Sequence, residues 1–270
     1  MVEPEPIKSR PGSSKSDKGR TIAAAPEAEK APHMETARPS SQDGEAPQPL
    51  HAETSKQVED LFRVLSPAFE GRESEDNWRH REKYITSLRR LTYGNAPHDF
   101  PQPFFTGIKT NLDGIFKAVN SLRTTLSTNG CLLIQDLAKI GGSRIDPMVE
   151  VIMQNLIKLC GGMKKISAQN GNVSVNDVLA NVTYTPRLLQ HVTSACQDKN
   201  AQLRLFAAGW LKTLLNKQSH HKSSLEHGGG LALLEKSLKR GLTDANPGIR
   251  EAMRGAFWTF HQMWPARGNK

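Results

Sequence analysis

Long apolar runs and closely spaced cysteines are missing from this sequence of 270 residues. No stretch reaches the roughly 18 consecutive apolar residues that a membrane-spanning helix needs, and the N-terminal MVEPEPIKSR lacks the apolar core of a signal peptide. The only cysteines, Cys131, Cys160 and Cys196, are far apart and have apolar neighbours. Their spacing excludes a disulfide framework and a CxxC zinc site. We therefore expect a protein of the cytosol or nucleus, without membrane association, whose cysteines belong to the core.

Catalytic sequence patterns are also missing. The chain contains no HExxH, CxxC, GxSxG, Walker or GxGxxG pattern. His220 and His221 lie in a polar segment without neighbouring carboxylates or thiols, and the glycines at 228–230 follow no predicted strand. We expect neither an enzyme nor a bound cofactor or metal.

Aromatic residues are absent from residues 1–54, which hold half of the 16 prolines. Such a composition cannot bury enough apolar area to offset chain entropy, so we predict a disordered linker over 1–54 and a folded domain over 55–270. Seven Lys and Arg against nine Asp and Glu give the linker a formal charge of −2; because the whole chain carries +9, the domain carries +11. A basic domain implies an acidic partner: nucleic acid, anionic lipid or an acidic protein face.

Apolar residues recur at helical spacing from Ser55 onward, and no stretch alternates as a strand would. The sequence therefore predicts an all-α fold. Capping residues or prolines mark four helix starts, at Thr54, Asp146-Pro147, Thr185-Pro186 and Asn246-Pro247.

A basic residue recurs near the start of every second predicted helix, with separations of 42, 42, 39 and 46 residues. These residues are Arg81, Arg123, Lys165, Arg204 and Arg250. A period of about 40–47 residues with two helices per unit is typical of HEAT-like repeats, which stack into an α-solenoid. We predict five helical hairpins, over residues 54–93, 100–141, 143–182, 185–217 and 224–264.

Equivalent positions of stacked hairpins fall on one face, so the basic residues should line one edge. Two interpretations stay open for Arg123, Arg204 and Arg250. Either they pair with Asp or Asn of the neighbouring repeat and stabilise the stack, or they face a partner. Lys165 is less suited to bidentate pairing and favours an exposed position.

Trp78 lies in the most polar stretch of the domain, EGRESEDNWRHREK, at the first predicted turn between helices. In one interpretation the indole folds back over the hairpin as a cap. In the other it is an exposed anchor at the head of the basic edge, since Trp and Arg dominate binding hot spots.

These residues together resemble a TOG domain, most closely the tubulin-binding unit of the CLIP-associating proteins (the CLASP family), and within it the second TOG unit. The resemblance spans about residues 55–265. The segments that carry it are WxxR from Trp78, SLRTTLSTNGCLLIQDLA from Ser121, MKKISAQNG from Met163, TPRLLQHVTSACQDKNAQLR ending at Arg204, and LTDANPGIREAMRGAFWTFHQMWP ending at Pro265. Two departures are the glycine-rich LEHGGGLALL stretch and the chain end soon after Pro265, which suggests a fragment of a longer protein.

The resemblance implies that the five loops between paired helices face tubulin. The implied contact residues are Trp78, Arg81, Ser121, Arg123, Lys164, Lys165, Lys199, Asn200, Arg204, Asn246 and Arg250. It further implies a microtubule-stabilising, rescue-promoting regulator of the cytoplasm and cytoskeleton. In division it would act at the spindle and kinetochores and in the nucleus, with spindle or kinetochore proteins as further partners of the parent chain. The alternative is a HEAT-repeat adaptor for another acidic protein or for nucleic acid, the latter being the less expected partner.

Overall fold

The computed structural model describes residues 46–268, so the predicted disorder of residues 1–45 lies outside the described residues. Helices account for all regular secondary structure in the described part, and none of these helices combines the length and apolarity needed to cross a bilayer. The predicted all-α class is confirmed.

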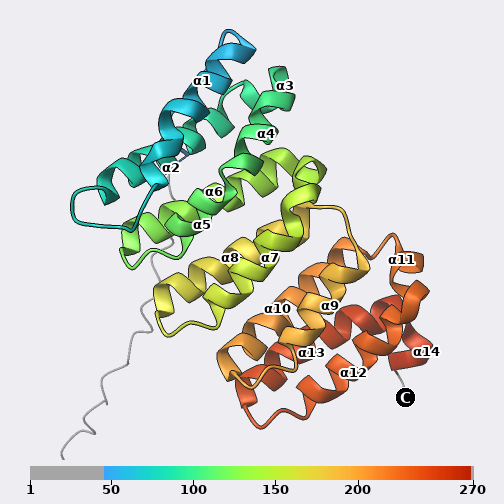
Figure 1. The fold of residues 1–270 in the computed structure, drawn as a ribbon. Coiled ribbons are helices and arrows are strands. Elements are labelled where there is room, and N and C mark those ends of the chain that lie inside the picture. The colour runs from blue at the N-terminus through green and yellow to red at the C-terminus, as the bar shows by residue number, and fades with distance from the viewer. Residues whose placement is uncertain (1–45, 269–270) are drawn as a thin grey trace, which may run out of the picture. The chain divides into compact units, whose positions relative to one another are not determined.

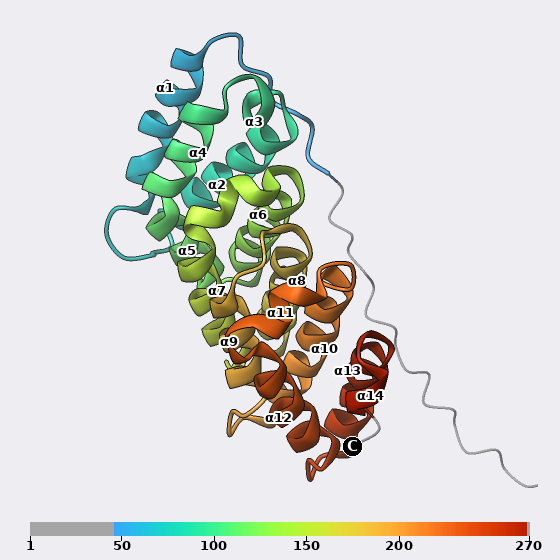
Figure 2. The same cartoon turned by 90° about the vertical axis from the view of Figure 1, so that its right-hand side faces the viewer.

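Five long helices form one layer of the domain, and each packs against the next in chain order. They are α2 (Trp78–Tyr93), α6 (Thr124–Gly141), α8 (Lys165–Asn181), α10 (Ala201–Lys217) and α13 (Pro247–Met263). The preceding helices form the second layer, as Figure 2 shows. They are α1 (Ser55–Leu65), α4 (Pro101–Thr110) with α5 (Leu112–Val119), α7 (Asp146–Cys160), α9 (Pro186–Ala195) and α12 (Gly230–Leu242). The result is the predicted α-solenoid of helical hairpins.

Short helical turns lie between these elements or, in the case of α14, after the last of them. They are η1 (Ser66–Phe69), α3 (Ala96–Asp99), η2 (Gly142–Ile145), α11 (Lys222–Glu226), η3 (His227–Gly229) and α14 (Pro265–Gly268). In the glycine-rich stretch, Gly228 and Gly229 adopt φ angles of 63° and 80°, which residues with a Cβ rarely adopt. The departure from the TOG pattern noted above is therefore a tight turn that leads into α12.

The helix starts follow from local capping chemistry. The Thr54 hydroxyl accepts from the Gln57 backbone N–H (3.2 Å) and the Thr185 hydroxyl accepts from the Leu188 N–H (3.3 Å). Asn246 Oδ1 accepts from the Gly248 N–H (2.8 Å). Each side chain satisfies a backbone donor that the first helical turn leaves unpaired, so the predicted starts are confirmed.

Polar side chains set the register between neighbouring long helices. Arg89 Nε of α2 donates to Asp136 Oδ2 of α6 over 2.7 Å, and both side chains are buried. Further along the stack, Trp210 Nε1 of α10 donates to Asn172 Oδ1 of α8 (2.8 Å). Buried polar groups without partners are costly, so these pairs favour one alignment of each helix on the next.

The three cysteines are buried in the core, as predicted. Burial raises the pKa of the Cys131 and Cys196 thiols to about 12, and also raises the pKa of Cys160. All three are therefore neutral, unreactive thiols at physiological pH.

Residues just before the predicted domain boundary at residue 55 contact the helical part of the chain. The Leu50 N–H donates to the Arg90 carbonyl (2.8 Å), and Ala52 exchanges two hydrogen bonds of 2.9 Å with the Asn95 side chain. A Cβ at Gly94 would lie 1.9 Å from the Leu50 oxygen, so a glycine permits this close approach. Backbone groups of Gln48, Leu50 and Ala52, on the linker side of the predicted boundary, therefore have partners about 40 residues away in α2 and the turn after it.

Candidate functional site

Five loops connect the first helix of each pair to the second. They follow η1, α5, α7, α9 and α12, and comprise residues 70–77, 120–123, 161–164, 196–200 and 243–246, here called loops 1 to 5. Figure 1 shows them along one side of the stack, which we call the loop edge. The recurrent basic residues lie in these loops or in the first turns of the helices that follow, so the predicted common edge is present.

Trp78 begins α2 at this edge and is half-buried. The guanidinium of Arg123 lies 4.7 Å from the centre of its ring, and that of Arg79 lies 5.4 Å away. Cations at these distances are attracted to the indole face. Trp78 is therefore neither a core residue nor a bare anchor: cationic side chains flank an indole that remains partly accessible.

Glu73 joins loop 1 to loop 2, a role that the basic pattern did not reveal. The Ser121 hydroxyl donates to Glu73 Oε1 (2.9 Å), and the same carboxylate oxygen lies 3.8 Å from Arg123 Nε. Arg123 also pairs with Glu75. The signal for this arrangement is the run of acidic residues just before Trp78. Ser121, which is only 7% exposed, and Glu73 therefore position Arg123 over the indole.

Arg81 does not belong to the exposed row, so its predicted place there is wrong. Its side chain is 2% exposed, and it donates to the carbonyls of Ala68 (3.1 Å), Glu70 (3.3 Å) and Gly71 (2.9 Å). The guanidinium also lies over the Phe69 ring, 5.3 Å from its centre. Arg81 holds the chain that leads into loop 1, because the backbone there folds over it.

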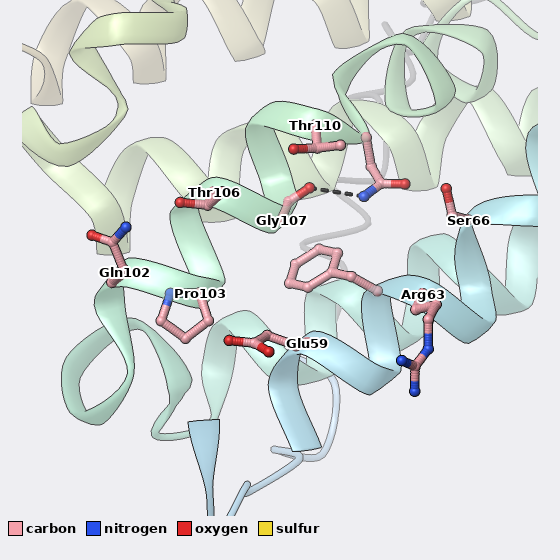
Figure 3. Close-up of a pocket in the computed structure, with 10 residues that line it drawn as sticks. Glu59, Arg63, Ser66, Gln102, Pro103, Thr106, Gly107 and Thr110 are labelled. Carbon is pink, nitrogen blue, oxygen red and sulfur yellow. Dashed lines mark hydrogen bonds between the residues drawn. The ribbon is translucent and has the colours of Figure 1, made fainter. Parts of the chain in front are cut away.

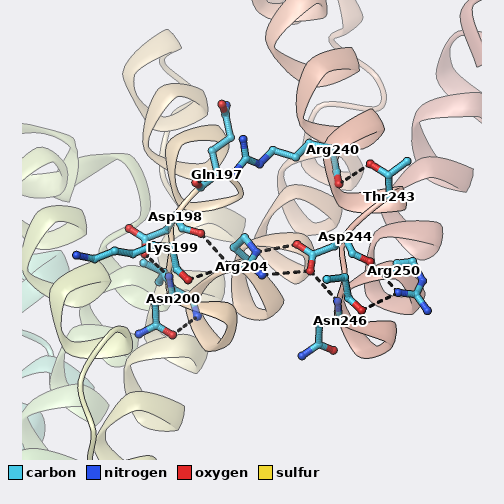
Figure 4. A network of polar contacts seen from close by, with 12 residues as sticks. Gln197, Asp198, Lys199, Asn200, Arg204, Arg240, Thr243, Asp244, Asn246 and Arg250 are labelled. Carbon is cyan, nitrogen blue, oxygen red and sulfur yellow. Dashed lines mark hydrogen bonds and ion pairs between the residues drawn. The ribbon is translucent and has the colours of Figure 1, made fainter.

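Arg204 joins loop 4 to loop 5 (Figure 4). Its Nε and a terminal nitrogen donate to the two Asp244 oxygens over 2.7 and 3.1 Å, and its other terminal nitrogen donates to the carbonyls of Asp198 and Lys199 at 3.0 Å each. The hydrogen bond from Arg204 lowers the pKa of the Asp244 carboxyl. The interpretation as a link between repeats is therefore the one that the structure favours for Arg204.

Arg250 repeats the local geometry of Arg204 without the final partner. One terminal nitrogen donates to the carbonyls of Asp244 (2.7 Å) and Ala245 (3.0 Å), six and five residues earlier, as in loop 4. Within residues 46–268 no carboxylate forms an ion pair with it. In Arg204, one edge of the guanidinium group binds Asp244. The same edge of the Arg250 guanidinium group is therefore available to a carboxylate from another molecule.

The two predicted asparagines cap helices. Asn200 Oδ1 accepts from the Gln202 N–H (2.9 Å), and its Nδ2 donates to the Gly161 carbonyl of loop 3 (3.0 Å). Asn246 caps α13 and is exposed. Both asparagines shape the loops that carry the charges.

The three predicted lysines are exposed at the loop edge. Lys164 Nζ donates to the Leu122 carbonyl (2.6 Å), which joins loop 3 to loop 2. Lys165 begins α8 and Lys199 lies in loop 4. No side-chain hydrogen bond or ion pair holds either of these two lysines among the described residues. The three lysines, Trp78 and Arg250 can therefore meet a partner without the loss of an ion pair within residues 46–268, whereas Arg123 already pairs with Glu73 and Glu75.

A groove of about 380 Å³ lies away from the loop edge, between α1 and α4 (Figure 3). Phe62, Pro103 and Gly107 line it, and Asn111 Nδ2 donates to the Gly107 carbonyl (2.9 Å). The residues that line the groove therefore lie outside the loop edge. Across residues 46–268, no group of three or more His, Cys, Asp and Glu is arranged to hold a metal ion.

Comparison with known proteins places the chain among its relatives. The family model described as CLASP N terminal matches residues 58–270. Protein stu1 of Aspergillus fumigatus is 66% identical over 237 residues, a match that covers 88% of this chain and 18% of that protein. The chain thus spans less than a fifth of the length of this relative.

Solved structures share the fold at low sequence identity. A chain from "Structural Basis of Microtubule Plus End Tracking by XMAP215, CLIP-170 and EB1" aligns with a TM-score of 0.61 at 15% identity, covering 76% of this chain and 80% of that one. A chain from "TOG-tubulin binding specificity promotes microtubule dynamics and mitotic spindle formation" aligns with a TM-score of 0.52 at 14% identity, covering 80% and 85%. These alignments support the solenoid architecture independently of sequence.

Proposed function

This chain belongs to the CLASP N-terminal family, and on that premise we propose that residues 46–268 form a TOG-type module that binds tubulin through the loop edge. The observation that carries the proposal is the row of available side chains along that edge. Trp78 directly follows loop 1 and Arg123 lies in loop 2. Lys164 and Lys199 lie in loops 3 and 4, Lys165 directly follows loop 3, and Arg250 lies in the first turn after loop 5. The TOG-tubulin study among the structural neighbours supports the choice of partner.

The charge of the edge suits this partner. Tubulin is strongly acidic, whereas residues 55–270 carry a formal charge of +11. Complementary charge speeds encounter and fixes orientation, and a partly buried aromatic residue at one end supplies affinity. A row that spans five loops suits a large protein surface and not a small molecule.

The module is proposed as a binding scaffold and not as an enzyme. In the full-length protein we propose that it helps to hold the regulator on microtubules of the cytoskeleton, where the regulator stabilises them and promotes rescue. Its place of action would include the mitotic spindle and kinetochores, where proteins bound by the rest of the parent chain would assist.

The test measures binding of the purified chain to unpolymerised tubulin by size exclusion and to microtubules by co-sedimentation. Trp78→Ala, and separately Lys165→Glu with Arg250→Glu, should each weaken binding by about 2 kcal/mol, the usual size of a hot-spot effect. A matched control is Lys109→Glu with Lys236→Glu, the same charge change at exposed positions on α4 and α12. Unchanged binding in both edge variants would contradict the proposal. Nucleic-acid binding that falls steeply with salt and tolerates Trp78→Ala would favour the adaptor alternative.

A further inference from the structure

Exposed apolar side chains gather at loops 2 and 3. Leu122 is 77% exposed, Met163 is fully exposed, and Ile166, in the first turn of α8, is 61% exposed. We call these three residues the apolar cluster. Eight large apolar residues are strongly exposed in the part of the chain that the structure describes, so more than a third of them belong to two adjacent short loops and the turn that follows.

The two loops lie against each other. The Lys164 ammonium donates to the Leu122 carbonyl (2.6 Å), and Met163 precedes that lysine while Ile166 follows it by two residues. At the helix starts just behind, the hydroxyls of Ser127 and Ser167 lie 3.3 Å apart. Leu122 therefore lies close to the loop that carries the other two side chains.

The fold does not account for these apolar residues. Loop positions of this kind usually hold polar side chains or glycine. The side chains that are buried at these two loops are small ones such as Ser121 and Ser167. Scattered apolar residues on a surface are ordinary, but adjacent ones bordered by charge typically mark a contact with another molecule.

We propose that the apolar cluster contacts tubulin directly and supplies the part of the affinity that salt does not weaken. This inference rests on the proposed function and deepens it. The choice of tubulin follows from continuity, because Arg123 joins loop 2 to Trp78 on one side, while Lys164 and Lys165 border the cluster on the other. The matching area on tubulin would be an apolar depression rimmed by acidic side chains.

Salt separates the two kinds of contact. The Debye length is about 10 Å at 0.1 M ionic strength and shortens as salt is added, so exposed Lys and Arg contacts weaken. Burial of apolar surface is not screened in this way. The unchanged chain should therefore lose part of its tubulin affinity between low and high salt and retain a residual affinity that the cluster provides.

The experiment measures affinity for unpolymerised tubulin at low and at high salt. The test variant is Leu122→Ser with Met163→Ser and Ile166→Ser. The control is Val151→Ser with Val173→Ser, which are 44% and 40% exposed on α7 and α8, away from the loops. We expect the cluster variant to lose about tenfold in affinity at low salt and about the same factor at high salt, because salt does not screen the lost contact, while the control changes less than twofold.

Two further measurements make each outcome decisive. Thermal unfolding should give the same midpoint for all variants, and Met163→Gln alone, which keeps the side-chain length, should still weaken binding at high salt. If Trp78→Ala and the charge reversals weaken binding but the cluster variant does not at either salt, the inference is wrong and the proposed function stands. If the unchanged chain binds no tubulin, the proposed function and the inference are both wrong.

Discussion

Replacing Arg204 with Met would remove the guanidinium between loops 4 and 5 and retain most of the aliphatic stem. The side chains of Arg204 and Asp244 are 16% and 7% exposed. In the variant, Asp244 loses its bidentate donor but still accepts from the Asn246 N–H (2.9 Å), and the Asp198 and Lys199 carbonyls lose their donor.

The magnitude lies between two limits. Exposed ion pairs contribute about 0–1 kcal/mol, whereas breaking a buried pair costs about 3–5 kcal/mol. Because Asp244 keeps one backbone donor and the pair retains some contact with water, we expect a loss of about 2–3 kcal/mol. For a domain of this size each kcal/mol shifts the melting temperature by about 2–4 °C, so the midpoint should fall by about 5–10 °C.

Thermal unfolding followed by circular dichroism measures this loss, and Arg254→Met is the matched control. The pair of Arg254 with Glu251 is exposed at both ends (57% and 73%), so its loss should shift the midpoint by about 2 °C or less. If Arg204→Met leaves the midpoint unchanged and abolishes tubulin binding, Arg204 contacts the partner and the reasoning from loop geometry is refuted.

The same pair has a pH signature. The hydrogen bond from Arg204 lowers the folded-state pKa of the Asp244 carboxyl below its ordinary value. A group with a lowered folded pKa contributes stability that is present above its unfolded pKa and is lost as pH falls through its folded pKa. The stability advantage of the unchanged chain over Arg204→Met should therefore persist from neutral pH to about pH 4 and shrink below it, as denaturant unfolding at each pH would show.

Two other positions test separate parts of the structure. Glu73→Gln should weaken tubulin binding by several-fold because Arg123 loses one of the carboxylates that hold it over Trp78. The control is Glu59→Gln on α1. Equal binding by the two variants would contradict the role of Glu73. Gly94→Ala should lower the free energy of unfolding by about 1–3 kcal/mol, since a Cβ there would lie 1.9 Å from the Leu50 oxygen. The variant should also expose residues 46–54 to protease. An unchanged cleavage rate would show that these residues are not held by α2.

Features that depend on near neighbours in the chain could be predicted from the sequence. Whether a helix begins at Thr54, Thr185 or Asn246 depends on a cap and a donor two or three residues later. The repeat period, the common edge and the resemblance to TOG domains follow from the same kind of information, repeated along the chain.

Which basic side chains are already paired within the domain was decided by contacts between residues far apart in the sequence. Arg204 and Arg250 have the same local sequence design, Asp-x-Asn-x-x-x-Arg, but only Arg204 meets a carboxylate, 40 residues further along in the next loop. Arg81 is buried because backbone carbonyls more than nine residues away surround it. The sequence places a basic residue at equivalent positions of successive repeats. Whether its charge is paired depends on the tertiary structure, which brings a carboxylate to Arg123 and Arg204 but, within residues 46–268, none to Lys165, Lys199 or Arg250.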